Sequence, residues 1–236
     1  MGLQINEIFE SIDGEGIRTG YLVTFIRTQF CNLKCDYCDT KYSWDACDDS
    51  GEQQYTVMTV DEIIDKCFEF GHKKVTFTGG EPLIQKEAPE LVASLLENGF
   101  EVNIETNGAV DLKEFENKMV EILSDDELVN NLIYTLDYKC PSSGEEDKMI
   151  MSNIPFLVKG DVLKFVCGSQ EDLDHMKSVV NEYVPEIPTF EVFISPVFGS
   201  LEGSEIVEYM KEHKMNNVRV QVQLHKIFWD PATRGV

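Results

Sequence analysis

Short runs of β-branched and aromatic residues recur along this chain, separated by longer stretches of helical or polar character. The runs expected to form strands are Gln4–Phe9, Tyr21–Thr28, Lys74–Thr78, Glu101–Glu105, Leu132–Asp137, Val162–Cys167, Phe190–Ser195 and Val218–Val222. From Tyr21 onward the strands alternate with helical stretches, which implies parallel strands joined by right-handed crossovers. Closing a full barrel takes about eight such units. Because only seven strand-like runs start at or after Tyr21, we expect an α/β fold built as a partial, open βα barrel.

Capping signals mark the helices between these strands. Thr59–Glu62 has the pattern of a capping box, and the helix that it begins should end at Phe70–Gly71. Ser169 should begin another helix. The turn Gly79–Pro82 should lead directly into a helix that ends at Asn98–Gly99. Two adjacent glycines after a strand also allow a ligand to approach the main chain closely.

Length and composition point to one domain spanning residues 1–236, with 42% hydrophobic residues for its core. No run of about eighteen apolar residues is present, so we expect no membrane span. The first residues, Met1 to Glu7, include an acid and lack the basic region of a signal peptide. Seven cysteines, an odd number without a secretion signal, argue against a disulfide framework. We therefore expect a protein of the reducing cytoplasm.

The formal net charge of −23, from 43 acidic and 20 basic residues, bears on possible partners. A nucleic-acid backbone would be repelled, and binding by counterion release needs clusters of Lys and Arg that this sequence lacks. We therefore expect no nucleic-acid partner and a free small molecule as substrate. The acidity by itself also fits a well-solvated surface.

The strongest chemical signal is the C-x3-C-x2-C group Cys31, Cys35 and Cys38, which follows the strand Tyr21–Thr28. Three thiolates fit a [4Fe–4S] cluster with one iron open to a small molecule, because four cysteines would complete the coordination. The next cysteine, Cys47, lies too far along the loop to join easily. A structural zinc site normally has four ligands, often in two paired motifs, and the chain has no second C-x2-C. We therefore favour a cluster over zinc, and over three unrelated buried cysteines.

With Tyr37 one residue before the third cysteine, this motif resembles that of the radical S-adenosylmethionine (SAM) enzymes. The turn Gly79–Pro82 resembles the superfamily's segment that holds the amino group of SAM. More narrowly, the chain resembles the 7-carboxy-7-deazaguanine synthases along its whole length. The segments that carry this resemblance are Glu7–Phe9, Asp13–Gly16, Phe25–Thr28, Cys38–Thr40 and His225–Val236.

The resemblance implies a lyase of 7-deazapurine and queuosine precursor biosynthesis. It would convert 6-carboxy-5,6,7,8-tetrahydropterin to 7-carboxy-7-deazaguanine with loss of ammonia, by radical chemistry that belongs to the cofactors. The implied cofactors are the [4Fe–4S] cluster, SAM, and Mg²⁺ bound by the hydroxyl of Thr40. Mg²⁺ keeps waters and substrate oxygens as ligands, so one protein hydroxyl suffices. The alternative for Thr40 is a cap on the next helical turn.

The resemblance also implies which residues contact SAM. They follow the cluster motif or lie at the carboxyl ends of strands, the face that carries the chemistry in βα barrels: Tyr37, Cys38, Asp39, Gly79, Gly80, Glu81, Glu105, Asn107, Asp137, Tyr138, Lys139, Ser195, Pro196, Val197 and Phe198. The chain departs from the commoner Ser-Pro-Lys version at Asp137–Lys139 and from the Gln-Pro version at Ser195–Phe198. Ser195 taken alone is better explained as a helix cap.

The residues implied to bind the substrate come from the N-terminal loop, two strand ends and the tail: Ile12, Asp13, Gly14, Glu15, Arg27, Thr78, His225 and Val236. Arg27 would clamp the substrate carboxylate with its guanidinium fork, or would form an ion pair with one of the many acids. Glu15 and the terminal carboxylate of Val236 would accept hydrogen bonds from the N–C–N edge of the pterin. Many family members carry Gln in place of Asp13. Loop and tail would then be extensions that cover the substrate, whereas the pattern alone indicates a hairpin turn and a core-sealing extension.

Two other functions are compatible with the cysteine motif. A glycyl-radical activase shares the spacing but acts on a protein and needs neither a carboxylate clamp nor Mg²⁺. A non-catalytic iron–sulfur electron carrier would leave Gly79–Pro82 without a purpose. The family resemblance further implies a homodimer that receives electrons from flavodoxin or ferredoxin. The other cysteines, Cys47, Cys67, Cys140 and Cys167, are interpreted as structural or incidental.

Overall fold

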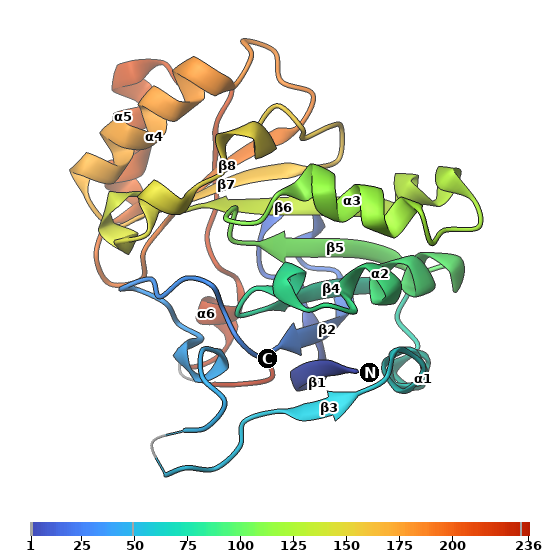
Figure 1. The fold of residues 1–236 in the computed structure, drawn as a ribbon. Coiled ribbons are helices and arrows are strands. Elements are labelled where there is room, and N and C mark those ends of the chain that lie inside the picture. The colour runs from blue at the N-terminus through green and yellow to red at the C-terminus, as the bar shows by residue number, and fades with distance from the viewer. Residues whose placement is uncertain (1, 49, 232) are drawn as a thin grey trace.

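The computed structural model describes residues 2–48, 50–231 and 233–236, whose strands form one nine-stranded sheet in the order β3-β1-β2-β4-β5-β6-β7-β8-β9 (Figure 1). The strands are β1 (Leu3–Ile12), β2 (Leu22–Thr28), β3 (Thr56–Met58), β4 (Lys74–Gly79), β5 (Glu101–Thr106), β6 (Leu132–Tyr138), β7 (Val162–Cys167), β8 (Glu191–Pro196) and β9 (Arg219–Val220). All neighbours from β2 to β9 are parallel. Because β3 and β9 end this sheet at opposite edges, the barrel is open, as predicted.

At one edge of this sheet the strands are antiparallel. The hairpin of β1 and β2 agrees with the hairpin turn that the residue pattern indicated, whereas β3 was not predicted. Strand β1 pairs antiparallel with β2 on one side and with β3 on the other. The strand expected over Gln4–Phe9 continues to Ile12, so the loop after it begins only at Asp13 and connects the two strands of a hairpin. The three-residue β3 is too short to carry a recognisable hydrophobic period.

The helices are α1 (Val60–Phe70), α2 (Ala88–Glu97), α3 (Leu112–Val120), α4 (Gln170–Tyr183), α5 (Gly203–His213) and α6 (His225–Phe228). The predicted capping box of α1 is confirmed, and Gly71 ends this helix at φ 75°. The hydroxyl of Ser169 accepts a hydrogen bond from the main-chain N–H of Asp172, which confirms the predicted start of α4. The prediction after β4 was wrong in one respect. The chain first makes a 3-10 turn over Pro82–Ile84, and α2 begins at Ala88.

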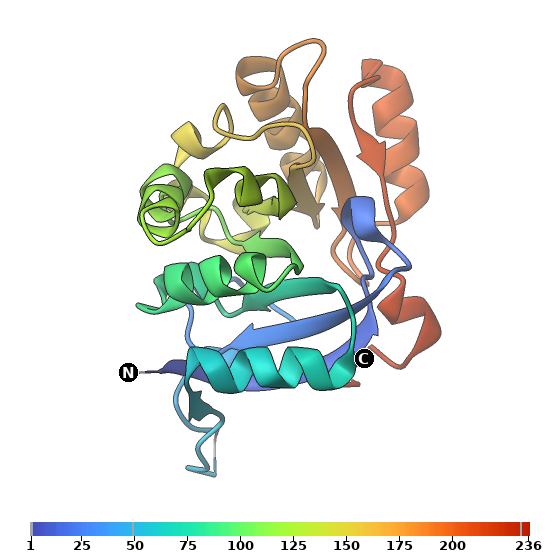
Figure 2. The same ribbon diagram turned by 90° about the vertical axis from the view of Figure 1, so that its right-hand side faces the viewer.

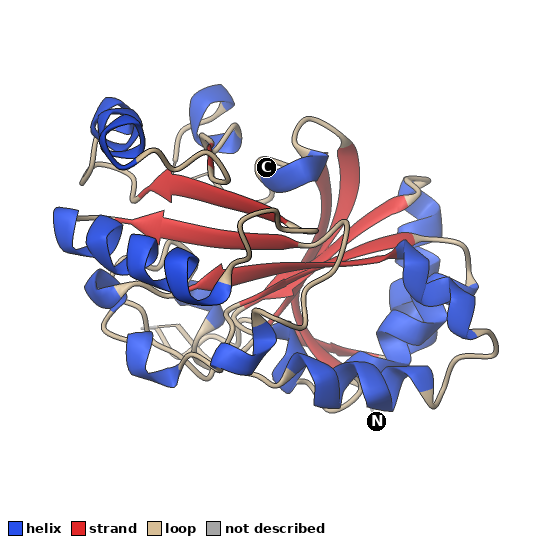
Figure 3. Cartoon of the chain, turned by 90° about the horizontal axis from the view of Figure 1, so that it is seen from above, coloured by secondary structure: helices blue, strands red, loops and turns tan. Residues whose placement is uncertain are grey.

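The core lies between the sheet and the helices that cover its outer side (Figures 2 and 3). Leu91, Leu95 and Leu96 of α2 are fully buried, as are Phe77 of β4 and Ile104 of β5. Each such side chain contributes about 1.5–3 kcal/mol when it leaves water. This packing fixes the strands, and with them the loops at their carboxyl ends. No helix among the described residues is long and apolar enough to cross a bilayer.

Candidate active site

A cavity of about 810 Å³ opens at the carboxyl ends of β2 and β4 to β7, where the cluster loop, the N-terminal loop and the C-terminal tail meet. The predicted site residues in its lining are Ile12, Asp13, Gly14, Glu15, Arg27, Cys31, Cys35, Tyr37, Cys38, Asp39, Thr40, Thr78, Gly79, Gly80, Glu105, Asn107, Asp137, Lys139, Val197, Phe198, His225 and Val236. The predicted residues outside the lining are Glu81, Tyr138, Ser195 and Pro196.

The loop that carries Cys31, Cys35 and Cys38 presents hydrogen-bond donors to sulfur. The main-chain N–H of Leu33 lies 3.4 Å from Cys31 Sγ, and the side-chain amide of Asn107 lies 3.6 Å from the same atom. Donors of this kind stabilise cluster sulfurs. Burial raises the pKa of the Cys31 thiol and raises that of Cys35 to about 11, which favours the protonated thiols near pH 7 when no metal is bound. Metal binding would release these protons. The donor set therefore fits an iron–sulfur cluster.

A single ion fits the same loop less well. Within the described ranges, no three His, Cys, Asp or Glu side chains lie close enough together to ligate one metal ion. Three thiolates that each bind a different iron do not need to approach one another so closely.

Gly80 packs directly against the cluster loop. A Cβ on Gly80 would overlap with the carbonyl oxygen of Phe30 and would lie 2.9 Å from Cys31 Cβ. The main-chain N–H of Gly80 donates to Thr28 O at 3.1 Å, and that of Glu81 donates to Phe30 O at 2.8 Å. The turn after β4 therefore holds the first cysteine in place, and only glycine fits at position 80 without a shift.

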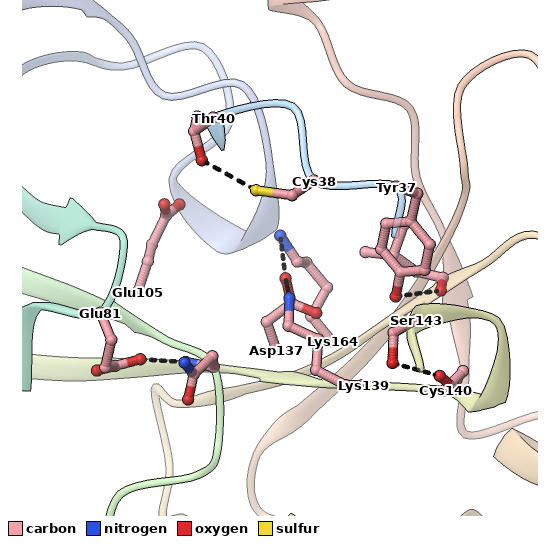
Figure 4. A network of polar contacts seen from close by, with 12 residues as sticks. Tyr37, Cys38, Thr40, Glu81, Glu105, Asp137, Lys139, Cys140, Ser143 and Lys164 are labelled. Atoms are coloured by element: carbon pink, nitrogen blue, oxygen red, sulfur yellow. Dashed lines mark hydrogen bonds and ion pairs between the residues drawn. The ribbon is translucent and has the colours of Figure 1, made fainter. Parts of the chain in front are cut away.

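The carboxylate of Glu81, which we expect from the sequence to contact SAM, instead accepts hydrogen bonds from the protein itself (Figure 4). It is fully buried and accepts hydrogen bonds from Leu83 N at 3.1 Å, Thr106 Oγ1 at 2.9 Å and Asn107 N at 2.7 Å. Burial raises its pKa to about 7, although these hydrogen bonds oppose the shift. Its observed contacts join the turn after β4 to the end of β5.

Tyr138 also faces away from the cavity. Its hydroxyl lies 3.1 Å from His175 Nε2 on α4, and its ring packs against Phe165. The neighbours Asp137 and Lys139 do line the cavity, because successive residues of a strand point to opposite faces.

Asp137 lies between two lysines in the cavity wall (Figure 4). Its Oδ2 is 3.0 Å from Lys139 Nζ and 3.5 Å from Lys164 Nζ. Burial raises the pKa of Asp137, but the two lysines outweigh it and hold the pKa below its usual range, so the carboxylate stays ionised. Asp137 Oδ1 and the hydroxyl of Ser195 are buried without a hydrogen-bond partner among the described residues. Asp137 lines the cavity, so its orphaned acceptor fits an amine or hydroxyl donor of a bound cofactor such as SAM, whereas Ser195 lies outside the lining.

Lys164 is a site residue that the sequence analysis missed. It lies on β7, whose residues are all buried, and its Nζ is 3.1 Å from Glu15 Oε2 as well as 3.5 Å from Asp137. Burial lowers its pKa, but Glu15 and Asp137 outweigh this and raise the pKa well above its usual value. The ammonium group therefore stays charged. The available signal was a lone cation within an otherwise apolar strand, since lysine is almost never buried without a partner.

The N-terminal loop is tied to the sheet beneath it. Asp13 is buried, accepts a hydrogen bond from Thr76 Oγ1 at 3.1 Å, and lies 3.4 Å from Arg18 Nε. Burial and the nearby Glu105 raise the pKa of Asp13 to about 7, although Arg18 opposes the shift. Glu15 is held by Lys164 and by Gln221 Nε2 at 3.4 Å. Both acidic side chains of the loop are therefore ordered before any ligand binds.

Arg27 forms an ion pair with an acidic residue, which was the alternative to a carboxylate clamp. Its Nε lies 2.8 Å from Glu7 Oε1, and it lines the cavity at the end of β2. Its two terminal nitrogens have no hydrogen-bond partner within the described part of the chain. Burial lowers its pKa, but Tyr42 and Glu7 outweigh this and raise it, so the guanidinium keeps its charge. The free edge of the fork remains suited to a carboxylate.

Thr40 stands at the N-cap of a 3-10 turn over Lys41–Ser43, but its side chain makes no capping hydrogen bond. Its hydroxyl lies 3.5 Å from Cys38 Sγ and lines the cavity (Figure 4). The capping alternative is therefore wrong for this side chain. Across the cavity, Thr78 Oγ1 donates to Glu105 Oε2 at 2.9 Å.

The C-terminal tail also reaches the cavity, where it contacts the N-terminal loop and the cluster loop. The main-chain N–H of Leu224 donates to Gly14 O at 3.1 Å, and Lys226 Nζ lies 2.9 Å from Asp39 Oδ2. His225 occupies the space that a Cβ on Gly14 would need. Burial lowers the pKa of His225, which favours a neutral imidazole near pH 7. The tail thus connects the N-terminal loop with the cluster loop.

Several known proteins are similar to this chain in sequence or in fold. Residues 25–130 match the profile of the Radical SAM superfamily. The chain is 43% identical to the 7-carboxy-7-deazaguanine synthase of Clostridium acetobutylicum over 100% of both chains, and 36% identical to that of Methanospirillum hungatei over 98% of this chain and 87% of the other. The crystal structure of QueE from Escherichia coli has a TM-score of 0.69 at 22% identity, covering 94% of this chain and 95% of that one. At that identity the structural likeness speaks for the fold alone.

Proposed function

We propose a role for each group of cavity residues, from the premise that this chain belongs to the 7-carboxy-7-deazaguanine synthase family of radical SAM lyases. The proposed reaction is the conversion of 6-carboxy-5,6,7,8-tetrahydropterin to 7-carboxy-7-deazaguanine with loss of ammonia. One observation carries it: the three cysteines, the glycine pair after β4 and the free edge of Arg27 line the same cavity. An activase or an electron carrier would not need the last of these.

Cys31, Cys35 and Cys38 would hold three irons of a [4Fe–4S] cluster. When bound, the cluster and SAM supply the radical that removes a hydrogen atom from the substrate. The main chain of Gly79 and Gly80 would lie against SAM, and Asp137 with Lys139 would bind its polar groups. Support comes from the unpartnered Asp137 Oδ1 in the cavity wall. Tyr37, Asp39, Glu105, Asn107, Val197 and Phe198 would complete this subsite.

Within this proposal Glu81 and Tyr138 act indirectly. Glu81 would fix the glycine turn relative to β5 through its three hydrogen bonds. Tyr138 would anchor the strand end against α4. Ser195 and Pro196 would contribute through the path of β8, which carries Val197 into the cavity.

The substrate would bind between the N-terminal loop, the strand ends and the tail. Arg27 would take its carboxylate with the two terminal nitrogens, while Nε stays on Glu7. Glu15 would accept hydrogen bonds from the N–C–N edge, with its charge already balanced by Lys164. Thr78 and the main chain of Val236 would contact the ring system. Ile12, Asp13, Gly14 and His225 would form the remaining wall.

Mg²⁺ would bind the hydroxyl of Thr40 together with substrate oxygens and water. Support comes from the position of this hydroxyl in the cavity and from its lack of a capping role. A hard cation of this kind needs few protein ligands.

The reaction is tested with anaerobically reconstituted protein, dithionite, SAM, Mg²⁺ and the carboxylated tetrahydropterin. We expect a deazapurine product by mass and about four irons per chain. Cys35→Ala should lose the iron and the product, whereas Cys47→Ser, at an exposed position, should keep both. Zinc in place of iron, or SAM left intact under reduction, would contradict the proposal.

We also propose that residues 1–236 act as one domain, that two copies form a homodimer, and that flavodoxin or ferredoxin donates the electron. Sedimentation analysis of the holoenzyme tests the dimer. Turnover with reduced flavodoxin or ferredoxin, in place of dithionite, tests the donor.

A further inference from the structure

Arg27 is connected to the C-terminal tail through a chain of three side chains, Glu7, Tyr42 and Arg234, of which Tyr42 and Arg234 also line the cavity. Glu7 Oε1 accepts from Arg27 Nε at 2.8 Å and also from the hydroxyl of Tyr42 at 3.2 Å. The guanidinium of Arg234 lies over the ring of Tyr42, 3.7 Å from its centroid. The order Arg234, Tyr42, Glu7, Arg27 therefore links a tail residue to the end of β2.

This arrangement restricts how the guanidinium of Arg27 can turn. Glu7 and Arg27 are on the paired strands β1 and β2 in direct register, so the acceptor of Nε comes from the sheet itself. The hydroxyl of Tyr42 donates to the same carboxylate oxygen and limits the rotation of Glu7. Once Nε is held, the planar fork can direct only its two terminal nitrogens toward the cavity.

Arg234 in turn has two contacts that fix its own position. Besides stacking on Tyr42, its Nη2 donates to Asn6 Oδ1 at 3.0 Å, and Asn6 Nδ2 donates to Gln29 Oε1 at 2.6 Å. A planar guanidinium stacked on an aromatic ring holds the ring as well as the arginine. The tail is thereby attached to the same strand pair that carries Glu7 and Arg27.

We propose that Tyr42 and Arg234 are positioning residues that, through Glu7, orient Arg27 toward the carboxylate of the substrate. This inference rests on the proposed role of Arg27 as a carboxylate clamp. Glu7 lies outside the cavity lining, so its effect on the ligand passes through Arg27. Tyr42 and Arg234 do line the cavity, so the test has to separate their action through Arg27 from a direct contact with the ligand. When the tail lies against Tyr42, the guanidinium of Arg27 keeps its orientation toward the cavity. Without the tail, Glu7 still accepts from Arg27, but Tyr42 is no longer held by Arg234 and Glu7 is free to turn more widely.

The test measures a ratio of two affinities, with anaerobic holoenzyme that carries cluster and SAM. The ligands are 6-carboxytetrahydropterin and tetrahydropterin without the carboxylate, and the ratio of their Kd values reports the clamp alone. We expect Tyr42→Phe to lower this preference about fivefold, because one hydrogen bond to a charged group is lost. We expect Arg234→Met to lower it about threefold through the lost stacking. The affinity for the ligand without a carboxylate should stay unchanged in both.

Two controls separate the possible failures. Arg219, which stacks on Phe193 at 4.8 Å and pairs with Glu191 outside the cavity, should tolerate Arg219→Met without any change in the ratio. Arg27→Met should abolish the preference. A preference that survives Arg27→Met but is lost when Arg234→Met is added would show that Arg234 contacts the carboxylate directly and would overturn the positioning role, and a preference that survives both changes would show that the clamp itself is wrong. If Arg27→Met abolishes the preference but Tyr42→Phe and Arg234→Met leave it intact, or weaken both ligands equally, the positioning role is wrong and the clamp stands.

Discussion

Asp137 and Lys164 are register partners on the neighbouring parallel strands β6 and β7, and their charged groups lie 3.5 Å apart in the cavity wall. Lys164 also reaches Glu15 at 3.1 Å, on a loop nearly 150 residues earlier in the chain. One buried cation thus connects the proposed SAM subsite with the proposed substrate subsite.

Lys164→Met should weaken SAM binding about tenfold or more, because it leaves Asp137 and Glu15 buried with one fewer cation. Equilibrium dialysis of SAM with the holoenzyme measures this effect. Lys164→Arg keeps the charge and should recover most of the affinity. Lys118→Met, which removes a surface pair with Glu114, should have no effect. Undiminished SAM binding in Lys164→Met would rule out the connecting role.

Gly80→Ala should lower the iron content and SAM affinity, because the new methyl group overlaps with the carbonyl of Phe30 and crowds Cys31. Cluster absorbance and iron analysis after identical reconstitution measure the loss, which we expect to exceed half. Gly99→Ala is the matched control. Gly99 has φ 80° with open space around it, so the substitution costs about 1 kcal/mol of backbone strain but leaves the cluster loop untouched.

Thr40→Ala should lower turnover and weaken its stimulation by Mg²⁺ without loss of stability, because the Thr40 side chain caps no helix. Thr59→Ala is the control, because it should change stability and not the response to Mg²⁺. It removes a capping-box hydroxyl from α1 and should cost about 1 kcal/mol of stability while Mg²⁺ stimulation stays the same. Rates measured against Mg²⁺ concentration, together with Tm values, separate the two effects. An unaltered Mg²⁺ response in Thr40→Ala would remove Thr40 from the metal site.

Asp13 should make stability depend on pH near neutrality. Its pKa in the folded chain is about 7, raised by burial from an ordinary value of 3.8, so folding favours the protonated acid. The stabilising contribution is complete below the ordinary pKa and is lost as the pH rises through about 7. Between about pH 6 and pH 8 the wild type should lose about 1.4 kcal/mol relative to Asp13→Asn. Thermal melts of both proteins across this range measure the difference, and parallel pH profiles would contradict it.

The parallel part of the fold could be predicted because its strands are buried apolar runs that are bounded by recognisable turn and helix-capping residues. Val162–Cys167 matches β7 at both ends, and the helix begun at Thr59 ends at Gly71 as expected. Strand β3 could not be predicted, since three residues carry no period and their pairing depends on β1.

The cavity could be predicted where residues follow parallel strands, whose carboxyl ends meet at one edge. Tyr138 was included with its neighbours as a segment, although alternation along a strand turns it to the other face. Tyr42 and Arg234 carried no chemical signal of their own. Their contact joins positions far apart in sequence, and only the folded chain brings them together.

The contact between Gly14 and His225 has a consequence for engineering. The ring of His225 fills the volume that any side chain at position 14 would require, and Leu224 is hydrogen-bonded to the same glycine. The N-terminal loop and the C-terminal tail are therefore complementary in shape. A chimera that takes its C-terminal segment from a relative should take the N-terminal loop from the same relative, because otherwise the new tail will not pack against the loop.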